Sequence, residues 1–139
     1  MKKFALIFLF FPALLLTGCN NDDDTTANAS GLEGLWFLYN VSGGFGGQNH
    51  DFEMAKFTWE FKPGNVLRVQ NNETDDNVPL SEGSYTYSIT DVEGVCNESL
   101  TASDRSFGCI TIQNDTLTLS EAFVDGSVLK FKKAMILGE

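Results

Sequence analysis

The side chains best able to do chemistry in this sequence are the thiols of Cys19, Cys96 and Cys109 and the imidazole of His50, the only histidine. Thiolates bind metal ions or form disulfides, and an imidazole transfers protons. A metal site would need more ligands than two cysteines supply, and His50 is poorly placed in the sequence to add one. No nucleophilic serine or cysteine motif lies near His50. We therefore predict no metal site, no cofactor and no enzyme activity.

Cys19 ends a segment that has the three parts of a secretory signal. Two lysines precede an apolar run over residues 4–16, and the small residues Thr17 and Gly18 stand directly before the cysteine. The apolar run is too short for a membrane-spanning helix, which needs about 20 residues. We expect residues 1–18 to be a cleaved signal peptide.

The tetrapeptide Leu16-Thr17-Gly18-Cys19 resembles the lipobox of bacterial lipoproteins. The resemblance implies that the Cys19 sulfur receives a diacylglycerol and that the amine freed by cleavage is acylated. Several acyl chains anchor a protein stably. The expected location is the cell envelope, with a lipid anchor in the outer membrane, on the periplasmic side or at the cell surface. An ordinary signal peptide with a chance cysteine is the alternative.

Residues 19–31 are predicted to be an acylated, disordered tether. Residues 20–30 contain no apolar side chain larger than alanine, so they cannot join a core. The acidic residues at 22–24 resemble a surface-export signal of some outer-membrane lipoproteins, and a plain solvated linker explains them equally well. The rest of the chain, residues 32–139, suffices for one domain with a single core.

Net charge restricts the partners of the protein. The formal net charge is −10, and such an acidic surface repels phosphate backbones and anionic lipid headgroups. We therefore expect no nucleic-acid partner, and membrane contact only through the lipid anchor. The sequence indicates no particular protein partner.

Cys96 and Cys109 are the two cysteines that remain once Cys19 carries lipid. In an exported chain, an even remainder predicts a disulfide. A bridge over a loop of this length would restrict the unfolded chain by about 3 kcal/mol.

The pattern after residue 32 is that of β-strands. In the clearest stretch, Phe57, Trp59 and Phe61 alternate with polar residues, so that one face is buried and the other solvated. Long connections at 43–53, 71–83 and 97–107 alternate with short ones, which in a meander gathers the long loops at one end. The sequence therefore predicts an all-β fold, an antiparallel up-and-down barrel of about eight strands that is open at the long-loop end. The expected strands are 35–42, 54–62, 66–70, 84–90, 92–96, 108–113, 116–120 and 127–133.

Gly34-Leu35-Trp36 opens the first strand as the Gly-x-Trp signature opens lipocalins. Together with Phe57-Thr58-Trp59-Glu60-Phe61 and the residues at 83–89, it is similar to the small lipocalin-like lipoproteins of bacterial outer membranes over most of residues 32–133. The resemblance implies that Trp36 plugs the closed end of the barrel and that a cation of the last strand packs over it. The candidates for this cation are Lys130, Lys132 and Lys133.

Aromatic residues would compete for the space inside such a barrel. Eight strands enclose room for either packed side chains or one small ligand, so a filled barrel and a ligand pocket both stay open. The candidates for the barrel interior, or for a ligand site in it, are Trp36, Phe57, Trp59, Phe61, Tyr85, Tyr87 and Phe131.

A glycine-rich flap is expected at the open mouth, where two phenylalanines can fold inward, and a merely mobile loop is the alternative. Its residues are Gly43, Gly44, Phe45, Gly46, Gly47 and Phe52. The leading functional hypothesis is a lipid-anchored, lipocalin-like protein of the cell envelope that binds or carries a small apolar ligand. The alternative is a filled β-barrel that serves as a surface interaction or accessory module for protein or glycan, without a small-molecule ligand.

Replacement of the predicted acylation site, Cys19→Ser, is expected to abolish membrane retention and to leave the fold unchanged, because the tether contributes nothing to the core. Partitioning into a detergent phase measures the first effect and circular dichroism the second. A Cys19→Ser protein that still enters the detergent phase would show that Cys19 carries no lipid.

Overall fold

The computed structural model describes residues 31–121 and 125–135, so the predicted signal peptide, Cys19 and the tether up to residue 30 lie outside the described residues. In the described part of the chain there are nine strands, and no helix is long and apolar enough to cross a membrane. The strands are β1 (Gly34–Gly43), β2 (Gln48–Asp51), β3 (Phe57–Lys62), β4 (Val66–Asn71), β5 (Gly83–Val92), β6 (Cys96–Ala102), β7 (Arg105–Gln113), β8 (Thr116–Ser120) and β9 (Ser127–Lys133).

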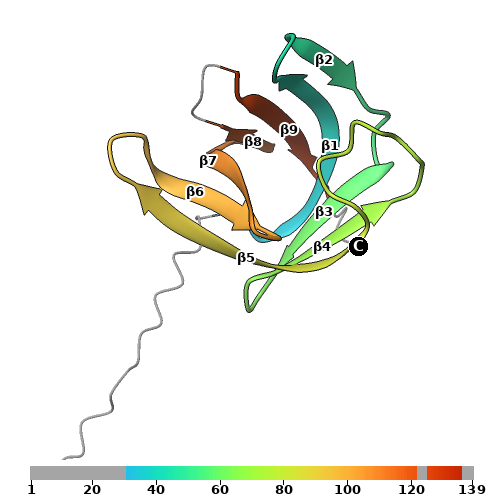
Figure 1. Cartoon of the computed structure of the whole chain (residues 1–139). Coiled ribbons are helices and arrows are strands. Elements are labelled where there is room, and N and C mark those ends of the chain that lie inside the picture. The colour runs from blue at the N-terminus through green and yellow to red at the C-terminus, as the bar shows by residue number, and fades with distance from the viewer. Residues whose placement is uncertain (1–30, 122–124, 136–139) are drawn as a thin grey trace, which may run out of the picture.

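The strands form one antiparallel sheet that closes on itself (Figure 1). From β3 to β9 each strand pairs with the next along the chain, and β9 returns to pair with β1. This closure confirms the predicted all-β, eight-stranded up-and-down barrel. β2 is an additional strand, which pairs with residues 40–43 of β1, whereas β3 pairs with residues 34–37.

The alternation of apolar and polar residues along each strand builds the core. In β1, Trp36, Leu38 and Asn40 are buried, and the residues between them are partly exposed. Successive side chains of a strand point to opposite faces, and directly paired residues of neighbouring strands share a face. Trp36 of β1 pairs with Trp59 of β3, so both tryptophans lie inside the barrel.

Several of the predicted connections were wrong. Residues 97–107, expected as a long loop, belong to β6 and β7, which a two-residue turn joins. Ser103 and Asp104 of this turn have φ angles of 53° and 59°, and two consecutive positive φ angles are what a type I′ hairpin requires. In place of the expected strand at 92–96, residues 93–95 form the turn between β5, which ends at Val92, and β6, which begins at Cys96, and the expected long loop at 43–53 contains β2.

A bulge explains part of this error. The register between β6 and β7 shifts at Leu100 and Thr101, and Gly108 lies opposite with a φ angle of +80°. A side chain at Gly108 would collide with the backbone of Ser120 in β8. Bulges insert an extra residue into one strand and so break the two-residue period by which strands are recognised in a sequence.

The predicted disulfide is present. Cys96, the first residue of β6, is bonded to Cys109 in β7, and their Cα atoms are 6.0 Å apart. The bond ties the two strands together beside the bulge, where their ladder is irregular.

Loss of this disulfide in the double variant Cys96→Ala/Cys109→Ala is expected to lower the free energy of unfolding by about 2 to 4 kcal/mol, because the unfolded chain gains freedom. Urea denaturation of the variant and of the unreduced parent measures the difference. Two free thiols, found by alkylation of unreduced exported protein, would contradict the disulfide itself.

Candidate functional site

The structure places the predicted interior residues on the inner face of the barrel. All but one are buried, and Tyr85, near the start of β5, is half-buried. The buried ones are Trp36, Phe57, Trp59, Phe61, Tyr87 and Phe131.

Their rings are in contact with one another through the middle of the barrel. The ring centroid of Trp59 lies 4.9 Å from that of Phe131, 5.2 Å from that of Phe107 and 6.2 Å from that of Phe61. Phe61 in turn meets Tyr87 edge-on at 5.2 Å. Such tilted and edge-to-face arrangements are the favoured geometry of packed aromatic cores. None of these rings lines the polar cavity on β7, β8 and β9 or the apolar cavity beside the disulfide, both of which lie on the outside of the barrel.

Trp36 closes one end of the barrel, the end at which β1 begins, which is called the lower end. Its Nε1–H donates to the carbonyl oxygen of the buried Leu32 at 2.7 Å. The ammonium of Lys133 lies 5.1 Å from the centroid of the Trp36 ring, a cation–π distance, and also donates to the carbonyl oxygen of Gly31 at 3.1 Å. Of the three lysines considered from the sequence, Lys133 is therefore the one that packs over the tryptophan.

The opposite end, predicted to be an open mouth, is covered by the loop between β4 and β5, residues 72–82. Val78 and Leu80 of this loop pack against the core. The Tyr85 hydroxyl donates to the Ser81 carbonyl oxygen at 2.8 Å, and the Arg105 guanidinium donates to the Pro79 carbonyl oxygen at 3.0 Å. The Tyr85 hydroxyl thus has its partner in the loop and does not need one in a ligand.

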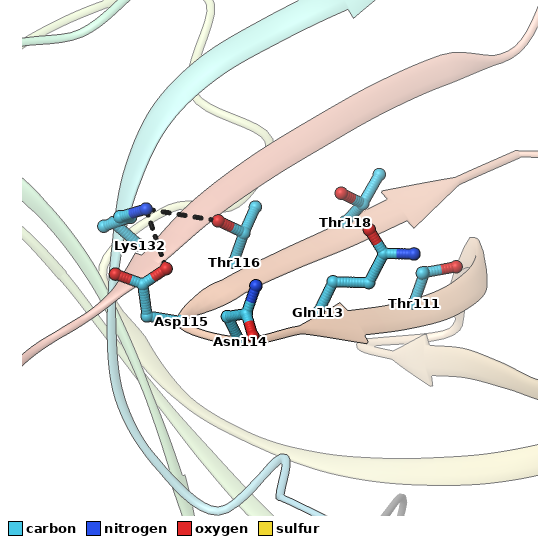
Figure 2. A pocket seen from close by; sticks show the side chains of 7 residues that line it. All are labelled: Thr111, Gln113, Asn114, Asp115, Thr116, Thr118 and Lys132. Atoms are coloured by element: carbon cyan, nitrogen blue, oxygen red, sulfur yellow. Dashed lines mark hydrogen bonds and ion pairs between the residues drawn. The ribbon is translucent and has the colours of Figure 1, made fainter.

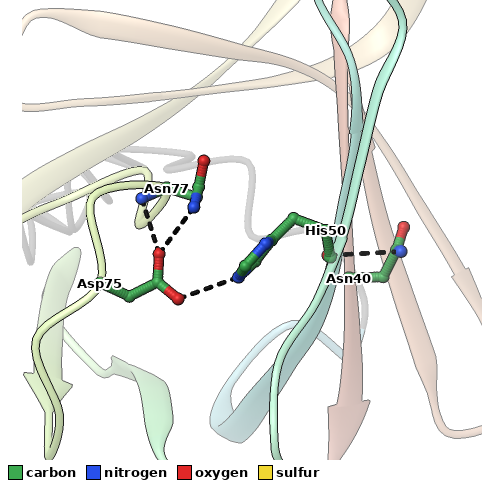
Figure 3. Close-up of polar contacts among 4 residues, drawn as sticks. All are labelled: Asn40, His50, Asp75 and Asn77. Carbon is green, nitrogen blue, oxygen red and sulfur yellow. Dashed lines mark hydrogen bonds and ion pairs between the residues drawn. The ribbon is translucent and has the colours of Figure 1, made fainter.

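A polar network joins this loop to β2 (Figure 3). His50 Nε2 lies 2.9 Å from Asp75 Oδ2, and the backbone N–H of Asn77 donates to Asp75 Oδ1 at 2.8 Å. The hydrogen bond from the Asn77 backbone is the main reason why the pKa of Asp75 lies below its usual value. The stability that this carboxylate contributes is therefore present above the unfolded-state pKa and is lost as the pH falls through the lowered folded-state pKa.

The predicted flap is a hairpin rather than a free loop. Gly44 to Gly47 form the turn between β1 and β2, and the Gly44 N–H donates to the Gly126 carbonyl oxygen at 3.2 Å. Phe52 folds inward as expected and packs on Phe57, with ring centroids 4.9 Å apart. Phe45 does not, since 94% of it is exposed. A role of the hairpin in ligand entry stays a prediction.

Three residues that were not predicted from the sequence to lie inside the barrel also help to fill it. Phe107 contacts Trp59 directly, yet it stands next to the bulge in a stretch expected as a loop. Val78 and Leu80 lie in a polar loop. Because a loop has no strand period, the sequence does not indicate that these two side chains pack on the core. The alternation of Leu100 with Ala102 is the signal by which β6 could have been found.

Two of the described cavities are large enough to hold a small ligand, and both lie on the outer face. A polar cavity of about 310 Å³ lies on β7, β8 and β9, and an apolar one of about 300 Å³ lies beside the disulfide, next to Val92 and Val95. Within the described residues, no cluster of histidine, cysteine, aspartate or glutamate is arranged to hold a metal ion.

Comparisons of the chain with protein families, with curated proteins and with solved structures give no match. The structure alone defines the class of the protein. It is a closed antiparallel β-barrel of eight strands with one additional strand and an interior of packed aromatic side chains.

Replacement of the plug residue, Trp36→Ala, is expected to cost about 3 to 5 kcal/mol of unfolding free energy through the cavity that it leaves. The exposed Phe45→Ala is the matched control and should change stability by less than about 0.5 kcal/mol. Urea denaturation followed by circular dichroism measures both. A cost below about 1 kcal/mol for Trp36→Ala would mean that the lower end of the barrel is not closed by this side chain.

Proposed function

We propose that the protein is a lipid-anchored, lipocalin-like barrel of the cell envelope that works through its outer surface, as an interaction module for protein or glycan. The observation that carries this proposal is the packing of the interior, where Trp59 contacts rings from β3, β7 and β9. A barrel of eight strands has room for its own side chains or for one small ligand. Here aromatic side chains already take up that space.

The two closed ends support the same proposal. Trp36 and Lys133 shut the end at which the chain enters, and residues 72–82 cover the other. A ligand would have to displace Val78 and Leu80 and break the contact between His50 and Asp75 before it reached Phe57. Each of these steps costs binding free energy.

The entry point of the chain suggests an orientation at the membrane. Gly31, the first described residue, lies beside Lys133 at the closed lower end. With acylation at Cys19, the tether joins the lipid surface to this end. The β1–β2 hairpin and the 72–82 loop lie at the other end, remote from the attachment point.

Carriage of a small apolar ligand is the second candidate function. It is favoured by one observation, namely that a loop rather than strands covers the mouth above the aromatic interior. Loops open more readily than ladders of strand hydrogen bonds, and such an opening would admit a ligand at this end.

Titration of the soluble Cys19→Ser protein with fatty acids, retinoids, haem and sterols distinguishes the interaction module from a carrier of a small apolar ligand. The packed interior predicts no saturable change in tryptophan emission. Phe107→Ala is the positive control, because it opens a void 5.2 Å from the centre of the Trp59 ring, where a probe such as benzene can bind and change the emission. Saturable binding by the parent protein, weakened by Phe57→Ser or Tyr87→Ser, would contradict the proposal and establish carriage.

A further inference from the structure

We propose that the outer face of β7, β8 and β9 carries a binding site for a neutral saccharide. The site is the polar cavity of about 310 Å³, whose side chains stand together on one side of the sheet (Figure 2). The inference rests on the proposed function, since it names glycan as the partner and this face as the place of contact.

Hydrogen-bonding groups line the cavity throughout. The hydroxyls of Thr111, Thr116 and Thr118 and the amides of Gln113 and Asn114 can each donate and accept hydrogen bonds. Sugar hydroxyls do the same, so they can replace the water of such a surface without leaving a polar group unpaired. The volume also lies within the range of small-ligand pockets.

The charges of the cavity cancel within it. Lys132 Nζ donates to Asp115 Oδ1 at 2.8 Å and to Thr116 Oγ1 at 3.3 Å. The hydrogen bond from Lys132 lowers the pKa of Asp115, so this carboxyl group is charged at neutral pH. With one positive and one negative group paired, the cavity favours a neutral ligand over an ionic one, and the acidic chain as a whole repels anions.

The strands and the turn that carry the polar groups are fixed before any ligand arrives. Thr111 pairs with Thr118 in the β7–β8 ladder, and Thr116 pairs with Lys132 in the β8–β9 ladder. The N–H of Lys133 donates to the Asp115 carbonyl oxygen at 2.7 Å, which fixes the β7–β8 turn against β9. Paired strands and a tied turn lose little backbone entropy when a ligand binds.

An aromatic ring extends the surface beyond the cavity. Phe37 of β1 is the register partner of Lys132, so it lies on the same outer face one strand away, and it is half-buried. A sugar ring presents an apolar C–H face, which an aromatic side chain can cover. A protein partner would call for an apolar centre of the contact surface, whereas the cavity itself is polar.

The test uses the soluble Cys19→Ser protein without the signal peptide of residues 1–18, and NMR titration with glucose, galactose, mannose, N-acetylglucosamine and their β-linked disaccharides. Saturable shifts of the backbone amides at residues 111–118 are expected for at least one of these sugars. Thr118→Val and Gln113→Ala should each weaken its binding about threefold to tenfold, the worth of one hydrogen bond. Thr86→Val, the same change at an exposed position of β5 outside the cavity, is the matched control and should leave the affinity unchanged.

Two results would overturn the site. One is the absence of amide shifts with every sugar at high millimolar concentration. The other is sugar binding that Thr118→Val and Thr86→Val affect equally, which would place the binding elsewhere. Neither result touches the filled interior, whereas saturable fatty-acid binding would overturn the proposed function whatever the sugars do.

Discussion

The packing of aromatic rings inside a closed barrel is the constraint on which the rest of the structure depends. Closure requires β1 to pair with β9, and the small bore that results has room for side chains or for one small ligand. Trp59 fills its middle through contacts with Phe107 and Phe131, and Trp36 fills its lower end. Because packed side chains occupy the inner face, we propose that recognition uses the outer face and the loops.

The two ends of the barrel are closed by different means. At the lower end, backbone and side chains of strand termini form the closure, with Trp36 held by Leu32 and Lys133. At the upper end, a loop lies over the core and is fastened by side-chain contacts such as that of His50 with Asp75. Motion, where the barrel permits it, is therefore expected at the upper end.

The sequence predicts those parts of the fold that follow from local period. The alternation of Phe57, Trp59 and Phe61 with polar residues predicts β3 and its buried face. The presence of two remaining cysteines predicts the disulfide. β6 is not predicted from the sequence, because polar residues and a bulge interrupt the alternation of apolar and polar residues along it. The loop that covers the upper end and the polar cavity are not predicted for another reason. Leu80 in a loop and Thr118 on a solvated face carry no sequence signal of their own. Their neighbours come from segments distant in the sequence and are set by the tertiary structure.

Mass spectrometry of the lipophilic extract from natively purified protein is the most direct test of a barrel filled by its own side chains. A filled barrel predicts that the extract contains no apolar molecule in stoichiometric amount. An equimolar fatty acid, sterol or similar molecule, whose removal changes tryptophan emission, would contradict it.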